Sequence, residues 1–112
     1  MHEVKGANGR MSFDGHFITI EPIGGIIAHF TGKAPQRIPL KSVEMIELVK
    51  PSFMKSGYIR VCTAGMAPLI GSPGRPAFMD ARSDPNALIF SRDQFQAFSA
   101  IRDEIEEALV GT

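Results

Sequence analysis

Three short stretches of the chain carry residue types that could do chemistry, and the first is Asp14-Gly15-His16. A carboxylate and an imidazole this close together could form a metal site or a catalytic pair. Turn formation explains them more simply, because Asp-Gly between two runs of strand-forming residues is a strong signal for a short hairpin. The other histidines, His2 and His29, have no partner at ligand spacing. We therefore expect no metal ion and no cofactor.

Cys62, the single cysteine, is the second candidate, as a nucleophile. It lies in a predicted strand on the same face as Arg60, and a nearby positive charge activates a thiol. A semi-buried, inert cysteine is the simpler interpretation. The third candidate, Gly32-Lys33, resembles the end of a phosphate-binding loop, but Ala34 replaces the Ser or Thr that such a loop needs. We expect no enzyme, and we keep an enzyme that uses Cys62 or the Asp14/His16 pair as an alternative.

The composition is that of one ordinary domain. The 112 residues include 12 Lys and Arg and 12 Asp and Glu, so the net charge is about zero and no nucleic-acid partner is expected. Residues 1–79 hold nine basic and five acidic side chains, net +4, and residues 80–112 hold three and seven, net −4. We interpret this as a basic face and an acidic helix, with head-to-tail association as the alternative.

We expect the protein to be cytoplasmic and to be encoded by a bacterium or by a phage that infects bacteria. One cysteine fits a reducing compartment, and the polar N-terminus lacks the apolar core of a signal peptide. No apolar run approaches the roughly 18 residues of a membrane-spanning helix.

Hydrophobic patterning predicts a β-rich body followed by one helix. We expect a flexible N-terminus over residues 1–9 and a single domain over residues 10–110. Strands are predicted at residues 10–13, 16–21, 25–30, 36–40, 43–50, 57–64 and 87–91. Pro39 places its strand at an edge or a bulge, and the broken alternation near Met45 predicts a bulge. The apolar positions after Ser91 recur at three- and four-residue steps, and Ser91 with Gln94 fits a capping box, so a helix is predicted over residues 92–110.

Residues 65–86 differ from the rest, with four of the eight prolines and several apolar side chains. One short strand is predicted at residues 77–81. The apolar residues of this segment could fold back over a barrel end, or they could form a contact patch for a protein partner. The candidate patch consists of Met66, Leu69, Ile70, Phe78 and Met79.

Several short motifs together resemble one family, a bacterial domain of unknown function found in actinobacteria and their phages. They are Phe13-Asp14-Gly15, Ile18, Ile20, Gly32-Lys33, Arg37-Ile38-Pro39-Leu40, Pro51, Gly57-Tyr58-Ile59-Arg60, Asp84, Asn86, Phe90, Phe95, Phe98, Ile101-Arg102 and Ile105. The resemblance implies a pleckstrin-homology-like (PH-like) fold, a curved antiparallel barrel or sandwich of about seven strands capped by the helix. Members are often joined to a SHOCT oligomerisation segment, which is not found before Thr112. The family supplies no catalytic residues.

We therefore expect a non-enzymatic module that binds a protein partner or another copy of itself, through an exposed strand edge or the 65–79 segment. Binding of anionic lipid or phosphate headgroups is the alternative, with Lys33, Arg37 and Arg60 as candidate anion ligands. A membrane partner is not expected, because the first hairpin turn, Asp14-Gly15, is short and acidic.

Overall fold

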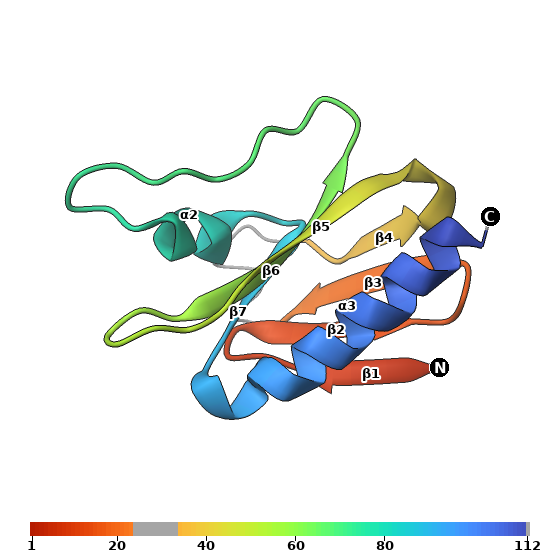
Figure 1. The fold of residues 1–112 in the computed structure, drawn as a ribbon, viewed down its shortest axis with the longest axis horizontal. Helices are drawn as coiled ribbons and strands as arrows, with labels where there is room; N and C mark the ends of the chain where they lie inside the picture. Colours follow the sequence, from red (N-terminus) through yellow and green to blue (C-terminus); the bar gives the residue numbers. More distant parts are fainter. Residues whose placement is uncertain (24–33, 112) are drawn as a thin grey trace.

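The computed structural model describes residues 1–23 and 34–111, which form two antiparallel sheets with a C-terminal helix (Figure 1). The first sheet has the order β1 (His2–Lys5), β2 (Gly9–Phe13), β3 (Phe17–Pro22) and β4 (Gln36–Pro39). The second has the order β5 (Val43–Val49), β6 (Gly57–Thr63) and β7 (Ala87–Phe90). The helices are α2 (Ala77–Ser83) and α3 (Phe95–Val110), with single 3-10 turns η1 (Leu40–Ser42) and η2 (Arg92–Gln94).

The predicted α+β class, with seven antiparallel strands and a C-terminal helix, is confirmed. The described strands do not close into a barrel, because hydrogen bonding stops at β4 on one sheet and at β5 on the other. Pro39 ends the edge strand β4, as predicted. The predicted strand at residues 25–30 lies outside the described residues.

The Asp14-Gly15 hairpin turn is confirmed. The Oδ1 atom of Asp14 accepts hydrogen bonds from the backbone N–H groups of His16 (2.8 Å) and Phe17 (2.7 Å). Gly15 has a φ of 97°, a conformation that a residue without a Cβ adopts at no steric cost. The bonds from Phe17 and His16 lower the pKa of Asp14, because they stabilise its charged form. The carboxylate is thus engaged by its own turn.

The N-terminus differs from the expected flexible tail, because His2–Lys5 pairs with β2 as an edge strand. The turn that follows also ties the two sheets together. Asn8 Oδ1 accepts from the N–H of Ile89 in β7 (3.0 Å), and the N–H of Ala7 donates to the Ile89 carbonyl (2.9 Å). A Cβ at Gly9 would lie 2.3 Å from the Glu21 carbonyl oxygen, so only glycine allows this approach. These contacts are non-local, and no sequence period marks them.

The second sheet contains the predicted bulge, since the register of β5 against β6 shifts between Val43 and Met45. Strand β6 is buried on both faces. Its inner face joins the main core, and Tyr58 on its outer face packs with Ala81 and Phe78 of α2.

The short strand predicted at residues 77–81 is wrong, because Ala77–Ser83 is a helix, α2. Pro76 precedes the first helical residue and has no N–H to leave unpaired. Ala81, fully buried, lets the helix lie close to the outer face of the sheet. Packing, rather than a long apolar period, therefore fixes this two-turn helix.

Helix α3 covers the side of the molecule where the two sheets splay apart (Figure 1). Its buried stripe is Phe98, Ile101 and Ile105, and the Phe98 ring stacks on Phe90 at a centroid distance of 4.6 Å. The capping box is confirmed by the Ser91 N–H, which donates to Gln94 Oε1 (3.0 Å). Among the described helices, none has the length and apolarity needed to cross a membrane.

Candidate functional site

A buried ion-pair cluster lies on the outer face of the second sheet. The Arg60 side chain, 7% exposed, donates from Nε to Asp84 Oδ2 (2.8 Å), and its Nη1 atom lies 3.4 Å from Glu47 Oε2. Burial opposes the charge of Arg60, but the hydrogen bond and charge of Asp84, with those of Glu47, outweigh it and raise the Arg60 pKa. The cation is therefore neutralised within the protein.

The same cluster also forms hydrogen bonds with the segment that follows β6. Arg60 Nη1 donates to the Ala67 carbonyl (2.7 Å), and the N–H of Leu69 donates to Glu47 Oε1 (3.4 Å). The Tyr58 hydroxyl also donates to Glu47 Oε1 (2.8 Å). Burial, with this bond to Glu47, raises the pKa of Tyr58. The segment is thus held down on the sheet by a shared polar cluster.

Cys62, the candidate nucleophile, lies next to Arg60, with its Sγ atom 3.6 Å from Nη1. The residue is buried. Burial raises the pKa of the thiol, and this outweighs the opposing effect of the Arg60 charge. The thiol is therefore protonated at neutral pH and faces paired charges rather than an open cleft.

The predicted contact patch at residues 65–79 is only partly exposed. Leu69 and Phe78 pack against the second core cluster, and Met79 is half-buried in α2. The half-buried Met66 turns its sulfur to the Thr63 backbone N–H, at 3.3 Å. Ile70 alone among the five is largely open to solvent, at 89%. The segment therefore folds back on the sheet and leaves Ile70 outside.

The three predicted anion ligands are not brought together by the described structure. Arg60 is paired as above, and Lys33 lies outside the described residues. Arg37 is exposed and stacks over the Phe17 ring at 3.7 Å, beside a hollow of about 610 Å³ that Lys41 and Glu44 also line.

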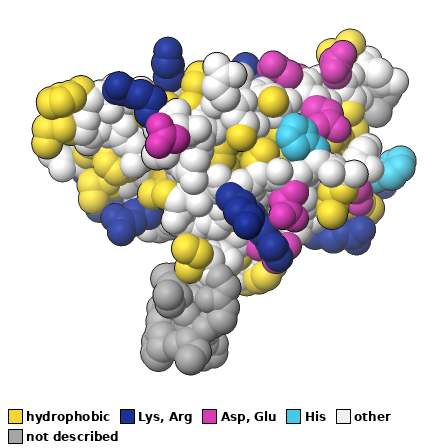
Figure 2. Space-filling view, turned by 90° about the horizontal axis from the view of Figure 1, so that it is seen from below, with side chains coloured by type: hydrophobic (Ala, Val, Ile, Leu, Met, Phe, Trp, Pro, Cys, Tyr) yellow, Lys and Arg dark blue, Asp and Glu magenta, His cyan; other side chains and the backbone are white. Residues whose placement is uncertain are grey.

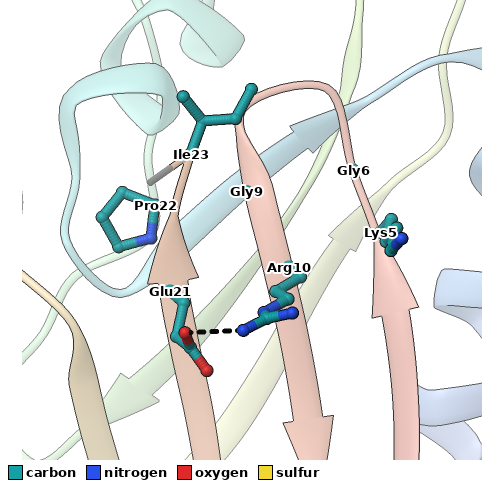
Figure 3. Close-up of a pocket in the computed structure, with 7 residues that line it drawn as sticks. All are labelled: Lys5, Gly6, Gly9, Arg10, Glu21, Pro22 and Ile23. Carbon is teal, nitrogen blue, oxygen red and sulfur yellow. Dashed lines mark hydrogen bonds and ion pairs between the residues drawn. The ribbon is translucent and has the colours of Figure 1, made fainter. Parts of the chain in front are cut away.

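A second hollow, of about 450 Å³, lies where β2 and β3 meet the turns that join them to the rest of the chain (Figure 3). Arg10 and Glu21 face each other across neighbouring strands there and form an ion pair of 3.1 Å. The guanidinium of Arg10 is thus already matched by a carboxylate. The β5–β6 hairpin, at the left end of the molecule in Figure 1, differs from this hollow because its turn exposes apolar side chains.

The turn of the β5–β6 hairpin exposes two large apolar side chains. Ser52 and Lys55 exchange backbone hydrogen bonds of 3.1 and 3.0 Å, with Phe53 and Met54 between them. Phe53 is 84% exposed and Met54 is 85% exposed. Met54 has a φ of 63°, which costs a residue with a Cβ on the order of 1 kcal/mol.

A second turn of the same kind lies nearby, in the segment before α2. Ser72 and Arg75 exchange backbone hydrogen bonds of 2.9 and 2.8 Å around Pro73-Gly74. Gly74 has a φ of 77°, the conformation that glycine favours at this turn position. Met54 thus occupies the same position in the Ser52–Lys55 turn as Gly74 does in the Ser72–Arg75 turn.

We define the tip surface as the turns Ser52–Lys55 and Ser72–Arg75 together with Ile70. A groove of about 490 Å³ between the two turns is lined by Ser52, Lys55, Tyr58, Ile70, Ser72 and Phe78, among others. In Figure 2, this left end of the molecule carries hydrophobic side chains with Lys and Arg beside them.

The tip surface lies in a long stretch of sequence without an acidic residue. Residues 48–79 contain Lys50, Lys55, Arg60 and Arg75 and no Asp or Glu. Arg60 is paired in the buried cluster and Arg75 pairs with Asp80 (2.8 Å). Lys55 is exposed next to Met54, and the exposed Lys50, three positions before Phe53, has its Nζ atom 5.7 Å from the centre of the Phe95 ring. This end of the molecule therefore combines positive charge with exposed apolar surface.

At residues 51–56 the sequence predicts only the connection between the strands at residues 43–50 and 57–64, so the tip surface was missed. A signal was present, because Phe53-Met54 follows a proline and a serine, where turns are normally polar. The absence of Asp and Glu from residues 48–79 is a second signal in the sequence. What the sequence could not give is the exposure of Phe53 and Met54, which depends on where the hairpin ends relative to the sheet.

Comparison with known proteins shows the family. The family model for a domain of unknown function (DUF4429) matches residues 11–106, so the chain belongs to the DUF4429 family. No curated protein and no solved structure matches the chain. Within residues 1–23 and 34–111, no three His, Cys, Asp or Glu side chains gather as a metal site requires.

Proposed function

We propose that this chain is a non-enzymatic binding module that engages its partner through the tip surface. The observation that carries the proposal is the exposure of Phe53, Met54 and Ile70 at one basic end of the molecule. Large apolar side chains that cluster outside the core mark interaction sites. The strained backbone of Met54 supports the same view, because strain of this kind is kept where a side chain has a role.

The proposal of a module without catalysis is supported by the buried polar cluster. Its charges satisfy one another, with Arg60 bonded to Asp84 and Glu47, and the segment that includes Ala67 and Leu69 covers it. We also propose a PH-like fold, in an open form. Two antiparallel sheets with a C-terminal helix over the splayed side support this, as does the early hairpin at Asp14-Gly15.

The experiment measures whether the tip surface is covered in the cell, whatever the partner. The substitution Phe53→Cys places a thiol on the tip, and Val110→Cys places one at the equally exposed end of α3. Cys62 is buried with a raised pKa, so the unsubstituted chain supplies a low background. Maleimide labelling rates are compared between purified protein and living cells at native expression.

We expect the thiol at position 53 to label several-fold more slowly in cells than in purified protein, after correction by the rate ratio at position 110. Equal ratios at both positions would show that the tip surface is free in the cell and would overturn the proposal. Unfolding curves of both variants confirm that the fold is unchanged.

A further inference from the structure

We infer that the tip surface docks on an anionic lipid bilayer, with Phe53, Met54 and Ile70 in the acyl-chain boundary and Lys50 and Lys55 at the lipid phosphates. This inference rests on the proposed function, because it names the partner class of the same surface. The sequence argues against lipid binding at the acidic Asp14-Gly15 turn and places the alternative anion site at Lys33, Arg37 and Arg60. The tip surface is a different and basic place.

The shape of the tip surface is the first argument. Phe53 and Met54 occupy the outer positions of a two-residue turn and are more than four-fifths exposed, as is Ile70. Phe53 and Met54 lie outside the groove between the two turns, whereas Ile70 lies at its edge. A protein partner would need a groove shaped to each projection, whereas a fluid bilayer adapts to a convex apolar tip.

The residue types beside the tip are the second argument. Phe53 and Met54 form the turn, the exposed Ser52 and Lys55 flank them directly, and Ser56 and the exposed Lys50 lie further from the turn, next to the two strands. Apolar side chains with hydroxyl and lysine groups beside them suit a bilayer, in which anionic headgroups lie next to the acyl-chain boundary. Long lysine side chains can reach back to the phosphates while neighbouring apolar groups are inserted.

The charge distribution is the third argument. Residues 48–79 contain no acidic side chain that a negative surface would repel, and the next one, Asp80, is paired with Arg75. The acidic residues of α3 lie mainly toward the end of that helix, which points away from the tip surface in Figure 1. The chain is neutral overall, so the tip surface, with its lysines and no acidic residue from position 48 to 79, would favour contact with an anionic surface.

The fourth argument comes from the two turns themselves. The Ser72–Arg75 turn has Pro73-Gly74 at its two central positions, a combination that suits a tight turn with a positive φ at the second of them. The Ser52–Lys55 turn has Phe53-Met54 at the same positions. Turn formation alone would favour glycine at position 54. Insertion of the Met54 side chain into an apolar medium would explain why methionine occupies this position.

The probe is a vesicle series, of phosphatidylcholine alone and with about one third phosphatidylglycerol. The chain contains no tryptophan, so Phe53→Trp provides a single reporter on the tip, and Val110→Trp provides the control on α3. With anionic vesicles, we expect a blue shift in the emission of the Phe53→Trp variant. The shift should decrease as salt is raised, since the attraction of the two lysines is screened. We expect no shift for Val110→Trp.

Flotation of the otherwise native chain gives an independent measure. Phe53→Ser with Met54→Ser should lower the affinity for anionic vesicles about tenfold or more, and Lys55→Gln should lower it and flatten the salt dependence. Val110→Ser should leave it unchanged. These positions are exposed, so the variants should fold, which circular dichroism verifies.

The inference is overturned if the native chain floats no better with anionic than with neutral vesicles, or if the Phe53→Ser/Met54→Ser variant floats equally well. Protection of position 53 in cells together with absent vesicle binding would keep the proposed function and assign the tip surface to a protein partner. A third outcome is vesicle binding that requires Phe53 and Met54, while the thiol at position 53 labels as fast in cells as in purified protein. This outcome would confirm the affinity for lipid but would show that the tip surface does not bind a membrane in the cell.

Discussion

Replacing Arg60 by methionine tests whether the buried ion-pair cluster holds the outer face of the second sheet. Methionine keeps much of the apolar stem of arginine but leaves Glu47 and Asp84, whose side chains are 12% and 17% exposed, without their cation. Removing one partner of a buried ion pair costs about 3–5 kcal/mol. Because both carboxylates keep some access to water, we expect the lower end, about 3 kcal/mol. That is a large part of the roughly 5–15 kcal/mol that stabilises an ordinary domain.

The assay is urea unfolding followed by far-ultraviolet circular dichroism, because the chain lacks tryptophan. Arg10→Met is the matched control, since Arg10 also pairs with one carboxylate but both side chains are well exposed. We expect the stability of that variant to remain near that of the unsubstituted chain. Hydrogen exchange at the Leu69 amide, which donates to Glu47, should accelerate in Arg60→Met more than exchange in β2.

A second substitution separates the electrostatic cause from lost packing. If the cost arises from unmatched carboxylates, adding Glu47→Gln to Arg60→Met should recover part of the lost stability, although Glu47→Gln alone destabilises. A loss below about 1 kcal/mol for Arg60→Met, or no recovery in the double variant, would refute the reasoning.

Three further predictions concern the core and the pH dependence of stability. Phe98→Ala removes the ring stacked on Phe90 and should cost about 3–5 kcal/mol in urea unfolding. The Cys62 pKa is raised by burial, so the unfolded chain loses this proton first and stability falls as pH rises above about 8.5; Cys62→Ala should flatten this fall in a pH series of unfolding curves. The Asp14 pKa is lowered by the N–H groups of Phe17 and His16, so its contribution is present above about pH 3.9 and is lost as pH falls through the lowered value. Asp14→Ala should therefore lower stability at neutral pH and reduce the loss in acid, measured by the same curves.

The features that the sequence predicted correctly are local. Asp14-Gly15 specifies its turn through its own backbone, Ser91 and Gln94 cap a helix from within four residues, and the broken alternation at Met45 is visible in one strand. Each is decided by neighbours in the chain, so single-sequence reasoning can find it.

The features that were missed depend on distant residues. β1 is a strand because β2 offers it an edge, and α2 is a helix because Ala81 and Phe78 pack on the sheet. A two-turn helix after Pro76 is too short to show a clear apolar period. The exposure of the candidate patch could not be predicted for a related reason, because Leu69 and Phe53 are both apolar loop residues in the sequence, yet Leu69 is packed and Phe53 is exposed.

The bond between Asn8 and Ile89 has a consequence for the order in which the chain can mature during synthesis. The hairpin of β2 and β3 leaves the ribosome well before β7, but the turn that precedes it is completed only by Ile89, 81 positions after Asn8 in the sequence. Until then the side chains of Met11 and Ile20 are not covered by β7 or α3. A nascent chain of this protein therefore carries an unfinished apolar surface until β7 has been synthesised. A pause in synthesis before Ala87 would prolong the interval in which chaperones are needed.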